Sequence, residues 1–134
     1  MNHTRCGIWR GARATALLAT VVDTERRRFT MRVPHDESRR WDWLSQLCGE
    51  HGLDLEIVLP DSLVKTDPIA RLALAHDLQV WLAPDSLVRG LRDVARLRGH
   101  AIAAMLARLP ECQAWRFHLR RVVSLDDPRQ LELL

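Results

Sequence analysis

Four carboxylates stand close to the two most apolar stretches of the chain. Glu56, Asp61, Asp67 and Asp85 are expected at or beyond the carboxyl ends of two parallel strands, the edge at which open α/β sheets usually bind ligands. Together they could hold a metal ion or a sugar. Asp61 and Asp85 each follow a proline and precede a serine, however, which is typical of a helix cap, and a cap contributes about 1 kcal/mol. We therefore expect these two aspartates to cap helices.

Arginines are the second group with possible chemistry. Of the 20 basic residues only Lys65 is a lysine, and the net charge is +3. Arg89, Arg92, Arg96 and His100 recur at helical spacing along an edge about 16 Å long at 1.5 Å per residue, where a phosphate backbone could lie. Arg26, Arg27 and Arg28 fall at a predicted hairpin turn and could extend that contact. The alternative is a solvated charged face, with arginine-rich composition arising from a GC-rich genome.

The tryptophans offer a third kind of contact. Trp41 and Trp43 are two residues apart on a predicted helix, so they cannot both face the core. One of them is expected near the surface, where it could anchor a partner protein or stack on a base. Trp81 lies within an apolar run and is predicted to be core.

The elements that position these residues are marked by a duplicated phrase. Residues 54–64 and 77–88 each consist of a short apolar run, then proline, then Asp-Ser. A run of this kind is typical of a buried strand that stops at the proline, with a helix starting at Asp-Ser. About one helix of chain separates the two copies. The repeat therefore predicts a parallel βαβ unit.

The flanking segments complete the predicted architecture. The apolar opening at 6–12, the β-branched run 15–22 and the alternating stretch 28–33 predict a three-stranded antiparallel meander. A helix is expected from about 37 to 48, ending at Gly49 or Gly52. One long helix is expected over 85–109, stopped by Pro110. Residues 114–125 are expected to add a strand. One domain, 1–125, with a loose tail, 126–134, is predicted.

This order of elements is the RNase H-like arrangement of α/β folds: a three-stranded antiparallel meander followed by βαβα units in a mixed sheet. A doubly wound α/β sheet is the alternative. Several short segments also resemble the opening of insertion-sequence transposases that carry a RuvC-like DEDD domain. These segments are Gly7–Arg10, Ala16–Asp23, Arg28-Phe29, Arg32–Pro34, Trp43-Leu44, Lys65–Asp67 and Ile69–Ala73.

The resemblance implies a nuclease site that this chain does not complete. Such enzymes hold two metal ions between carboxylates, one of which is on the first strand. That acid would fall at Trp9, and a second at Ala70, while Glu56 and Asp67 remain as counterparts of the others. The resemblance therefore implies a truncated relative without nuclease activity, in the setting of a bacterial plasmid or other mobile element.

Several classes of function and location have no sequence support. The chain has no Gly-rich phosphate loop, no nucleophile elbow and no Cys or His pair at zinc spacing, so no metal site is predicted. Cys6, Cys48 and Cys112 are scattered, which favours free thiols in a reducing cytoplasm. No apolar stretch approaches the roughly 20 residues of a membrane span, and the start of the chain lacks a signal-peptide pattern. We expect a cytoplasmic protein with no membrane contact.

Three functional hypotheses follow. The first is a non-catalytic, nucleic-acid-associated accessory protein without a cofactor, which binds through Arg89, Arg92 and Arg96, aided by 26–28. The second is a protein–protein interaction module that dimerises or docks on a partner through a sheet edge or through Trp41 and Trp43. The third is a divergent nuclease that would use Mg²⁺ on Glu56, Asp61 and Asp67.

Overall fold

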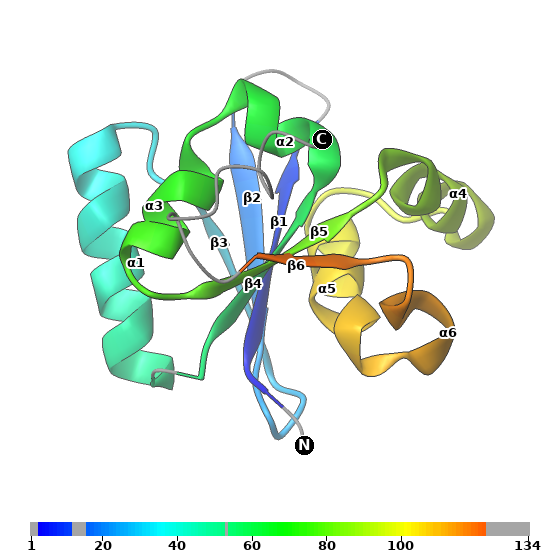
Figure 1. The fold of residues 1–134 in the computed structure, drawn as a ribbon, viewed down its shortest axis with the longest axis horizontal. Helices are drawn as coiled ribbons and strands as arrows, with labels where there is room; N and C mark the ends of the chain where they lie inside the picture. The colour runs from blue at the N-terminus through cyan, green and yellow to red at the C-terminus, as the bar shows by residue number, and fades with distance from the viewer. Residues whose placement is uncertain (1–2, 12–15, 53, 123–134) are drawn as a thin grey trace.

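The chain folds around one mixed β-sheet with helices on both faces, as the computed structural model shows for residues 3–11, 16–52 and 54–122 (Figure 1). The strands are β1 (Arg5–Arg10), β2 (Leu17–Val22), β3 (Arg28–Arg32), β4 (Glu56–Pro60), β5 (Gln79–Ala83) and β6 (Arg120–Val122). The helices are α1 (Glu37–His51), α2 (Asp61–Thr66), α3 (Ile69–Ala75), α4 (Asp85–Ala95), α5 (His100–Arg108) and α6 (Gln113–Arg116), with a 3₁₀ turn, η1 (Leu109–Glu111).

The strand order across the sheet is β3-β2-β1-β4-β5-β6. Strands β1, β2 and β3 pair antiparallel, which confirms the predicted meander. The two copies of the duplicated phrase form β4 and β5, which pair parallel with Glu56 opposite Gln79 and Pro60 opposite Ala83. The predicted βαβ unit is therefore confirmed. β4 also pairs parallel with β1, so the repeat joins the meander at the centre of the sheet.

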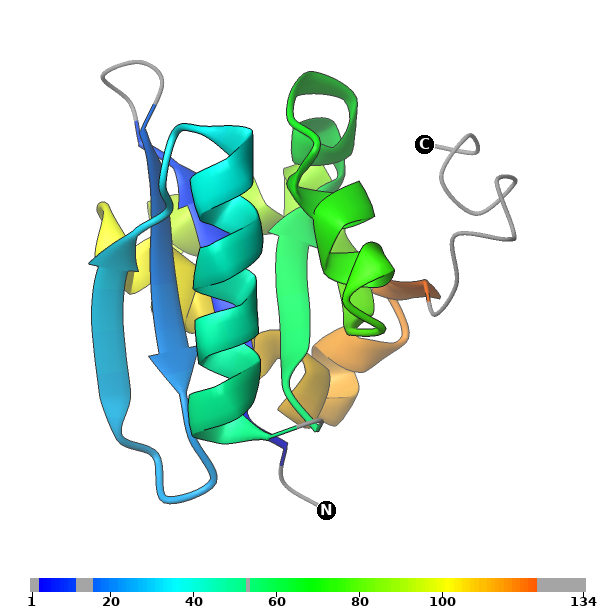
Figure 2. The ribbon, with the colours of Figure 1, turned by 90° about the vertical axis from the view of Figure 1, so that its left-hand side faces the viewer.

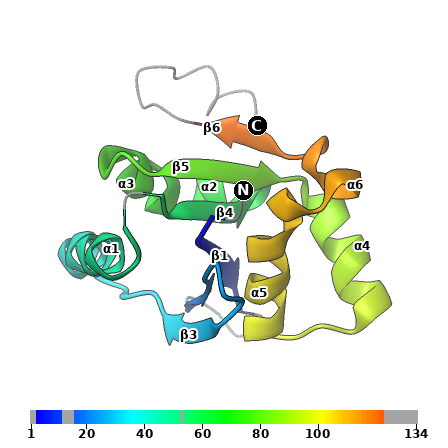
Figure 3. The ribbon, with the colours of Figure 1, turned by 90° about the horizontal axis from the view of Figure 1, so that it is seen from below.

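Side-chain alternation divides the interior into two layers. On β4, Ile57 and Leu59 face the layer under α1, α2 and α3, whereas Val58 faces the layer that contains residues of α4, α5 and η1. Figures 2 and 3 show α1 and α3 on one face of the sheet and α4, α5 and α6 on the other face. α1 ends at Gly52, one of the two glycines expected to stop it. Its φ of 84° is positive, but its ψ of 179° differs from the left-handed helical conformation that was expected.

The long helix expected over 85–109 is two helices. Arg96 adopts a left-handed conformation with φ of 53°, and Gly99 has φ of 55°, so the chain turns between α4 and α5. Thr20 Oγ1 on β2 donates a hydrogen bond to the carbonyl of His100, which holds the start of α5 against the sheet. The single-helix prediction was wrong because the chain adopts positive φ at Arg96 and again at Gly99, which apolar spacing does not reveal.

The last predicted strand is also shorter than expected. Residues 113–116 form α6, and within the part of the chain that the structure describes only 120–122 pair with β5, in the antiparallel direction. Residues 117–119 are not strand. The last part of that predicted strand, 123–125, and the predicted tail, 126–134, lie outside the described residues. None of the helices in the described ranges combines the length and apolarity needed to cross a bilayer.

Gly7 on β1 sets the distance between the sheet and α5. A Cβ atom built on Gly7 would lie 1.8 Å from the carbonyl oxygen of Ala103 and 2.8 Å from the backbone nitrogen of Ala107. Only a residue without a side chain therefore fits, because the atoms in the way belong to helix backbone. α5 presents Ala103 and Ala107, both buried, to the strands, so the helix packs almost directly on β1.

Gly7→Ala should destabilise the fold by about 3 kcal/mol or more, at the upper end of overpacking costs, because the clash is with backbone. Gly90→Ala is the matched control, since a Cβ there meets no atom within 4 Å on helix α4. It should instead stabilise by roughly 0.5–1 kcal/mol through helix propensity. Urea unfolding of both variants measures the two effects. Equal stabilities for Gly7→Ala and the parent would contradict this packing.

Candidate functional site

The predicted acidic residues are separated along β4. Glu56 is the first residue of the strand, so its expected position at the carboxyl end was wrong. Asp61 begins α2, just beyond the opposite end of the strand. Five residues of extended chain span about 16 Å, whereas two catalytic metal ions lie only about 4 Å apart. Glu56 and Asp61 therefore cannot share one metal centre.

Glu56 belongs to a buried ion-pair cluster. Its Oε1 accepts hydrogen bonds from Arg5 Nε at 2.8 Å and from Trp81 Nε1 at 3.1 Å, and its Oε2 lies 3.5 Å from Arg121 Nη2. Arg5 also lies 3.5 Å from Glu111. Trp81 is 5% exposed, as expected of a core residue. The carboxylate of Glu56 therefore links its own strand, β4, to side chains of β1, β5 and β6.

Asp67 has a similar structural role on the opposite layer. Its Oδ1 accepts hydrogen bonds from the buried Arg40 guanidinium and, at 2.9 Å, from the backbone N–H of Ile69 at the start of α3. Its Oδ2 lies 3.8 Å from Arg10. Asp67 therefore ties together β1, α1 and α3, and its charge is balanced by arginines on two sides.

Asp61 and Asp85 do not cap their own helices, contrary to expectation. Pro60 and Pro84 occupy the cap positions, and each aspartate is the first helical residue. Asp85 Oδ1 instead accepts hydrogen bonds from the backbone N–H and hydroxyl of Ser62, at 3.3 and 2.9 Å. Asp85, in the second copy of the duplicated phrase, therefore caps α2, the helix that follows the first copy. Burial, and then the neighbouring charge of Asp85, raise the pKa of Asp61.

Trp9 stands where the resemblance described above would require an acid on the first strand. Trp9 lines a pocket of about 280 Å³ at the ends of β1 and β4. The other lining residues are Arg10, Pro60, Ser62, Leu63 and Thr66. Throughout residues 3–11, 16–52 and 54–122, no three His, Cys, Asp or Glu side chains are grouped so that they could hold a metal ion.

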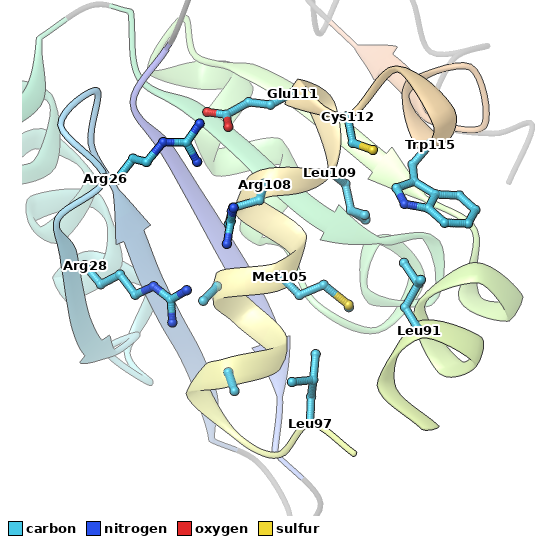
Figure 4. Close-up of a pocket in the computed structure, with 12 residues that line it drawn as sticks. Arg26, Arg28, Leu91, Leu97, Met105, Arg108, Leu109, Glu111, Cys112 and Trp115 are labelled. Carbon is cyan, nitrogen blue, oxygen red and sulfur yellow. The ribbon is translucent and has the colours of Figure 1, made fainter. Parts of the chain in front are cut away.

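A larger concave surface crosses the outer side of α5, and we call it the α5 groove. Its volume is about 510 Å³, within the roughly 300–1,000 Å³ of pockets that bind small molecules. Figure 4 shows arginines on the hairpin side of α5 and apolar side chains on the α4 and α6 side. The lining residues are Arg26, Arg28, Leu91, Leu97, Ala101, Ala104, Met105, Arg108, Leu109, Glu111, Cys112 and Trp115.

The charge of the α5 groove is predominantly positive. Three arginines, Arg26, Arg28 and Arg108, lie against one acid, Glu111, which is itself 3.5 Å from the buried Arg5. Within the described parts of the chain, none of the three groove arginines makes an ion pair, in contrast to Arg27. The groove therefore offers an anionic ligand guanidinium groups that are not already neutralised.

The hairpin between β2 and β3 fixes the directions of its three arginines. Arg26 has φ of 66° in the turn, and its N–H donates to the carbonyl of Asp23. Arg27 Nε pairs with Asp23 Oδ2 at 2.8 Å. Burial alone would raise the pKa of Asp23, but the hydrogen bonds and the charge of Arg27 outweigh that effect and lower the pKa. Arg27 is thus held by Asp23, while Arg26 and Arg28 reach the α5 groove.

A second, smaller depression adjoins the α5 groove at Leu97, which lines both. Arg92, Arg96 and Arg98 line it, together with Asp93, which pairs with Arg92 at 3.0 Å. The continuous basic helix edge predicted from Arg89 to His100 is interrupted, because the chain turns between α4 and α5. Arg92 and Arg96 still lie together in this depression, whereas Arg89 is exposed on α4 and lines neither surface.

Trp41 and Trp43 on α1 differ in exposure, as expected. Trp41 is 42% exposed, with its ring centroid 3.7 Å from that of His76. Trp43 is partly buried and donates its indole N–H toward Met31 Sδ at 3.2 Å. Both lie on the sheet face opposite the α5 groove (Figure 3). Trp41 is therefore the one of the pair available to a partner.

Sequence reasoning missed Arg98, Arg108 and Trp115. Arg108 lay within the expected long helix but away from its basic edge, and Trp115 was assigned to a strand. Gly99 was the overlooked signal, since a glycine directly after a basic residue is typical of a helix end. A break there would have placed Arg108 on a separate helix. No protein-family model matches the chain, and no curated protein matches it in sequence.

Asp61→Asn should raise the free energy of unfolding at pH 7. The pKa of Asp61 is raised in the folded state, so ionisation costs stability once the pH exceeds its unfolded value of about 3.9. The gain should disappear at pH 2, where the carboxyl group is protonated in both states. Asp42→Asn, on the exposed face of α1, should show no such pH-dependent gain. Denaturant unfolding of both variants at pH 7 and pH 2 measures the effect. A loss of stability of Asp61→Asn at pH 7 would contradict the prediction.

Glu56→Gln should destabilise the fold by about 3 kcal/mol, because it leaves the Arg5 charge buried without its main partner. The value is placed at the low end of the usual range because Glu111 also lies 3.5 Å from Arg5. Glu50→Gln, at an exposed site on α1, should change stability by less than about 0.5 kcal/mol. Thermal or urea unfolding compares the two. Similar small effects for both would show that Glu56 is not structural.

Proposed function

We propose that this protein is a non-catalytic accessory protein that binds nucleic acid through the α5 groove. The observation that carries the proposal is the combination of Arg26, Arg28 and Arg108 with an apolar floor that includes Trp115. Guanidinium groups bind phosphates in a bidentate manner, and aromatic rings stack on bases. The neighbouring depression adds Arg92, Arg96 and Arg98.

The expected binding is weak and largely independent of sequence. Phosphate contacts of this kind typically give dissociation constants of about 10⁻⁴ to 10⁻⁶ M at physiological salt. The groove offers few hydrogen-bonding groups besides its arginines, so it has little with which to read base edges. Affinity should therefore fall steeply as salt rises. The proposed site keeps Arg26 and Arg28 from the sequence prediction, adds Arg108 on α5 and leaves out Arg89.

The arrangement of strands supports an RNase H-like fold as part of the same proposal. An antiparallel meander β3-β2-β1 continues into β4 and β5, both parallel to β1, which is the order expected of that fold. We propose a degenerate relative of the transposase domain, with Trp9 in place of the acid, acting in the cytoplasm of a bacterium that carries a plasmid or other mobile element. Nuclease activity finds no support, because Glu56 and Asp67 are both engaged by arginines.

Docking of another protein is the second candidate function. Among the residues that the structure describes, strand β3 is hydrogen-bonded to β2 alone, and its Arg28, Phe29 and Thr30 are exposed. An edge of this kind can accept a further strand. Self-pairing centred on Thr30 would place Arg28 opposite Arg32 of the second copy, and like charges in that position are destabilising. This edge therefore favours an acidic partner over a homodimer.

A salt titration tests the proposed function. Fluorescence anisotropy with a labelled oligonucleotide should detect binding at about 50 mM salt, and affinity should decline linearly on a log–log plot. Arg108→Gln and Arg28→Gln should each reduce the slope by about 0.7 for a single strand. Arg39→Gln removes the same charge from the exposed face of α1, on the other side of the sheet. It should leave the slope nearly unchanged.

Absence of binding to both single-stranded and duplex oligonucleotides at about 50 mM salt would overturn the proposal. Equal effects of Arg39→Gln and Arg108→Gln would show that net charge, rather than the α5 groove, attracts the nucleic acid.

A further inference from the structure

We propose that the occupant of the α5 groove is an unpaired nucleic-acid strand, with bases on its apolar side and phosphates on its arginine side. This inference rests on the proposed function and adds the form of the nucleic acid. It follows from the different chemistry of the two sides of the groove, one charged and one apolar. Arg26 and Arg28 come from the hairpin on one side of α5, and Leu91 and Trp115 lie on the other side (Figure 4).

The apolar side is what distinguishes an unpaired strand from a duplex. Met105 and Trp115 are partly buried, so part of each side chain remains open to a ligand. In a duplex the faces of the bases are stacked on one another, and phosphates are the groups presented to a flat surface. A duplex would supply phosphates to the arginines and would leave the apolar side of the groove uncovered. Unpaired bases can cover apolar and aromatic surface, and stacking of this type tolerates any base.

The arginines argue for an anionic occupant over an apolar peptide. Arg108 is exposed on α5 and, with Arg26 and Arg28, faces only one acid of the groove lining. An apolar peptide would leave these charges without partners, and burying unpaired charge is costly. Charge complementarity therefore requires a negatively charged ligand, and the apolar floor requires that the same ligand carry flat, weakly polar groups. Nucleotides have both.

The adjoining depression indicates a polymer rather than a single nucleotide. Leu97 lines both surfaces, and beyond it lie Arg96 and Arg98. A backbone that leaves the hairpin arginines and passes Leu97 meets these two further guanidinium groups. Only a ligand with several phosphates can reach both sets. We therefore assign the path of the strand to the length of α5, from the end near Glu111 to the end near Leu97.

Cys112 provides a direct test in the unmodified protein. Its thiol is exposed and lines the α5 groove. Cys48, on α1 across the sheet, is an internal reference, and Cys6 is fully buried, which raises its pKa to about 12. Alkylation with a maleimide is followed by mass spectrometry. The ligands are an oligothymidylate, its duplex with oligodeoxyadenylate, and inorganic polyphosphate of similar charge.

The single strand should slow alkylation of Cys112 several-fold at low salt and leave Cys48 unchanged. The duplex and polyphosphate should protect much less at equal phosphate concentration. Equal or greater protection by the duplex would overturn the unpaired-strand inference while leaving nucleic-acid binding intact. Equal protection by polyphosphate would show that charge alone is recognised. Protection by none of the three would overturn both the inference and the proposed function.

A substitution separates stacking from charge. Trp115→Leu keeps an apolar side chain and should weaken single-strand binding about tenfold, the scale of losing one stacked base, with no change in the salt slope. Trp41→Leu removes an exposed indole from the opposite face and should have no effect. Unchanged affinity in Trp115→Leu, with an unfolding midpoint like that of the parent, would exclude base stacking. The protection experiment stands even if this variant fails to fold.

Discussion

The direct packing of α5 on β1 is the constraint on which the rest of this face depends. Gly7 leaves space for the backbone of Ala103 and Ala107, so α5 lies closer to the sheet than a helix with larger contacts could. Once α5 covers β1 and β2, α4 stands outside it and buries only Val88 fully. Leu91 and Leu97 remain at the surface. The α5 groove therefore crosses the outer side of α5, from the β2–β3 hairpin to the apolar side chains of α4 and α6.

The arginines of this protein divide into buried ones with ion-pair partners and exposed ones. Arg5 and Arg40 are buried and each pairs with a buried or half-buried acid, which locks strands and helices together. Such pairs contribute little net stability, but losing one partner is costly. Arg28 and Arg108 are exposed and have no ion pair among the residues described. The sorting of arginines between core and groove is a property of the fold.

The sequence was sufficient to predict strands β1 to β5 and how they pair, and it failed in the segment after β5. The duplicated phrase predicted two parallel neighbours, because buried strands are apolar on both faces. The α4–α5 break was missed because apolar spacing continues through Arg96 and Gly99. Asp85 was expected to cap its own helix, but it accepts hydrogen bonds from Ser62 of α2 instead. Only the parallel pairing of β4 and β5 brings these two residues together. The groove likewise joins a hairpin to a distant helix, which no local pattern encodes.

The most direct test of the account is a chemical-shift map of the protein titrated with a short unpaired oligonucleotide at low salt. Perturbed amides should lie on the β2–β3 hairpin and along α5, and among the five indole signals that of Trp115 should move most. The indoles of Trp41 and Trp43 should not move. Shifts confined to α1 and α3, or an unperturbed Trp115, would contradict the account.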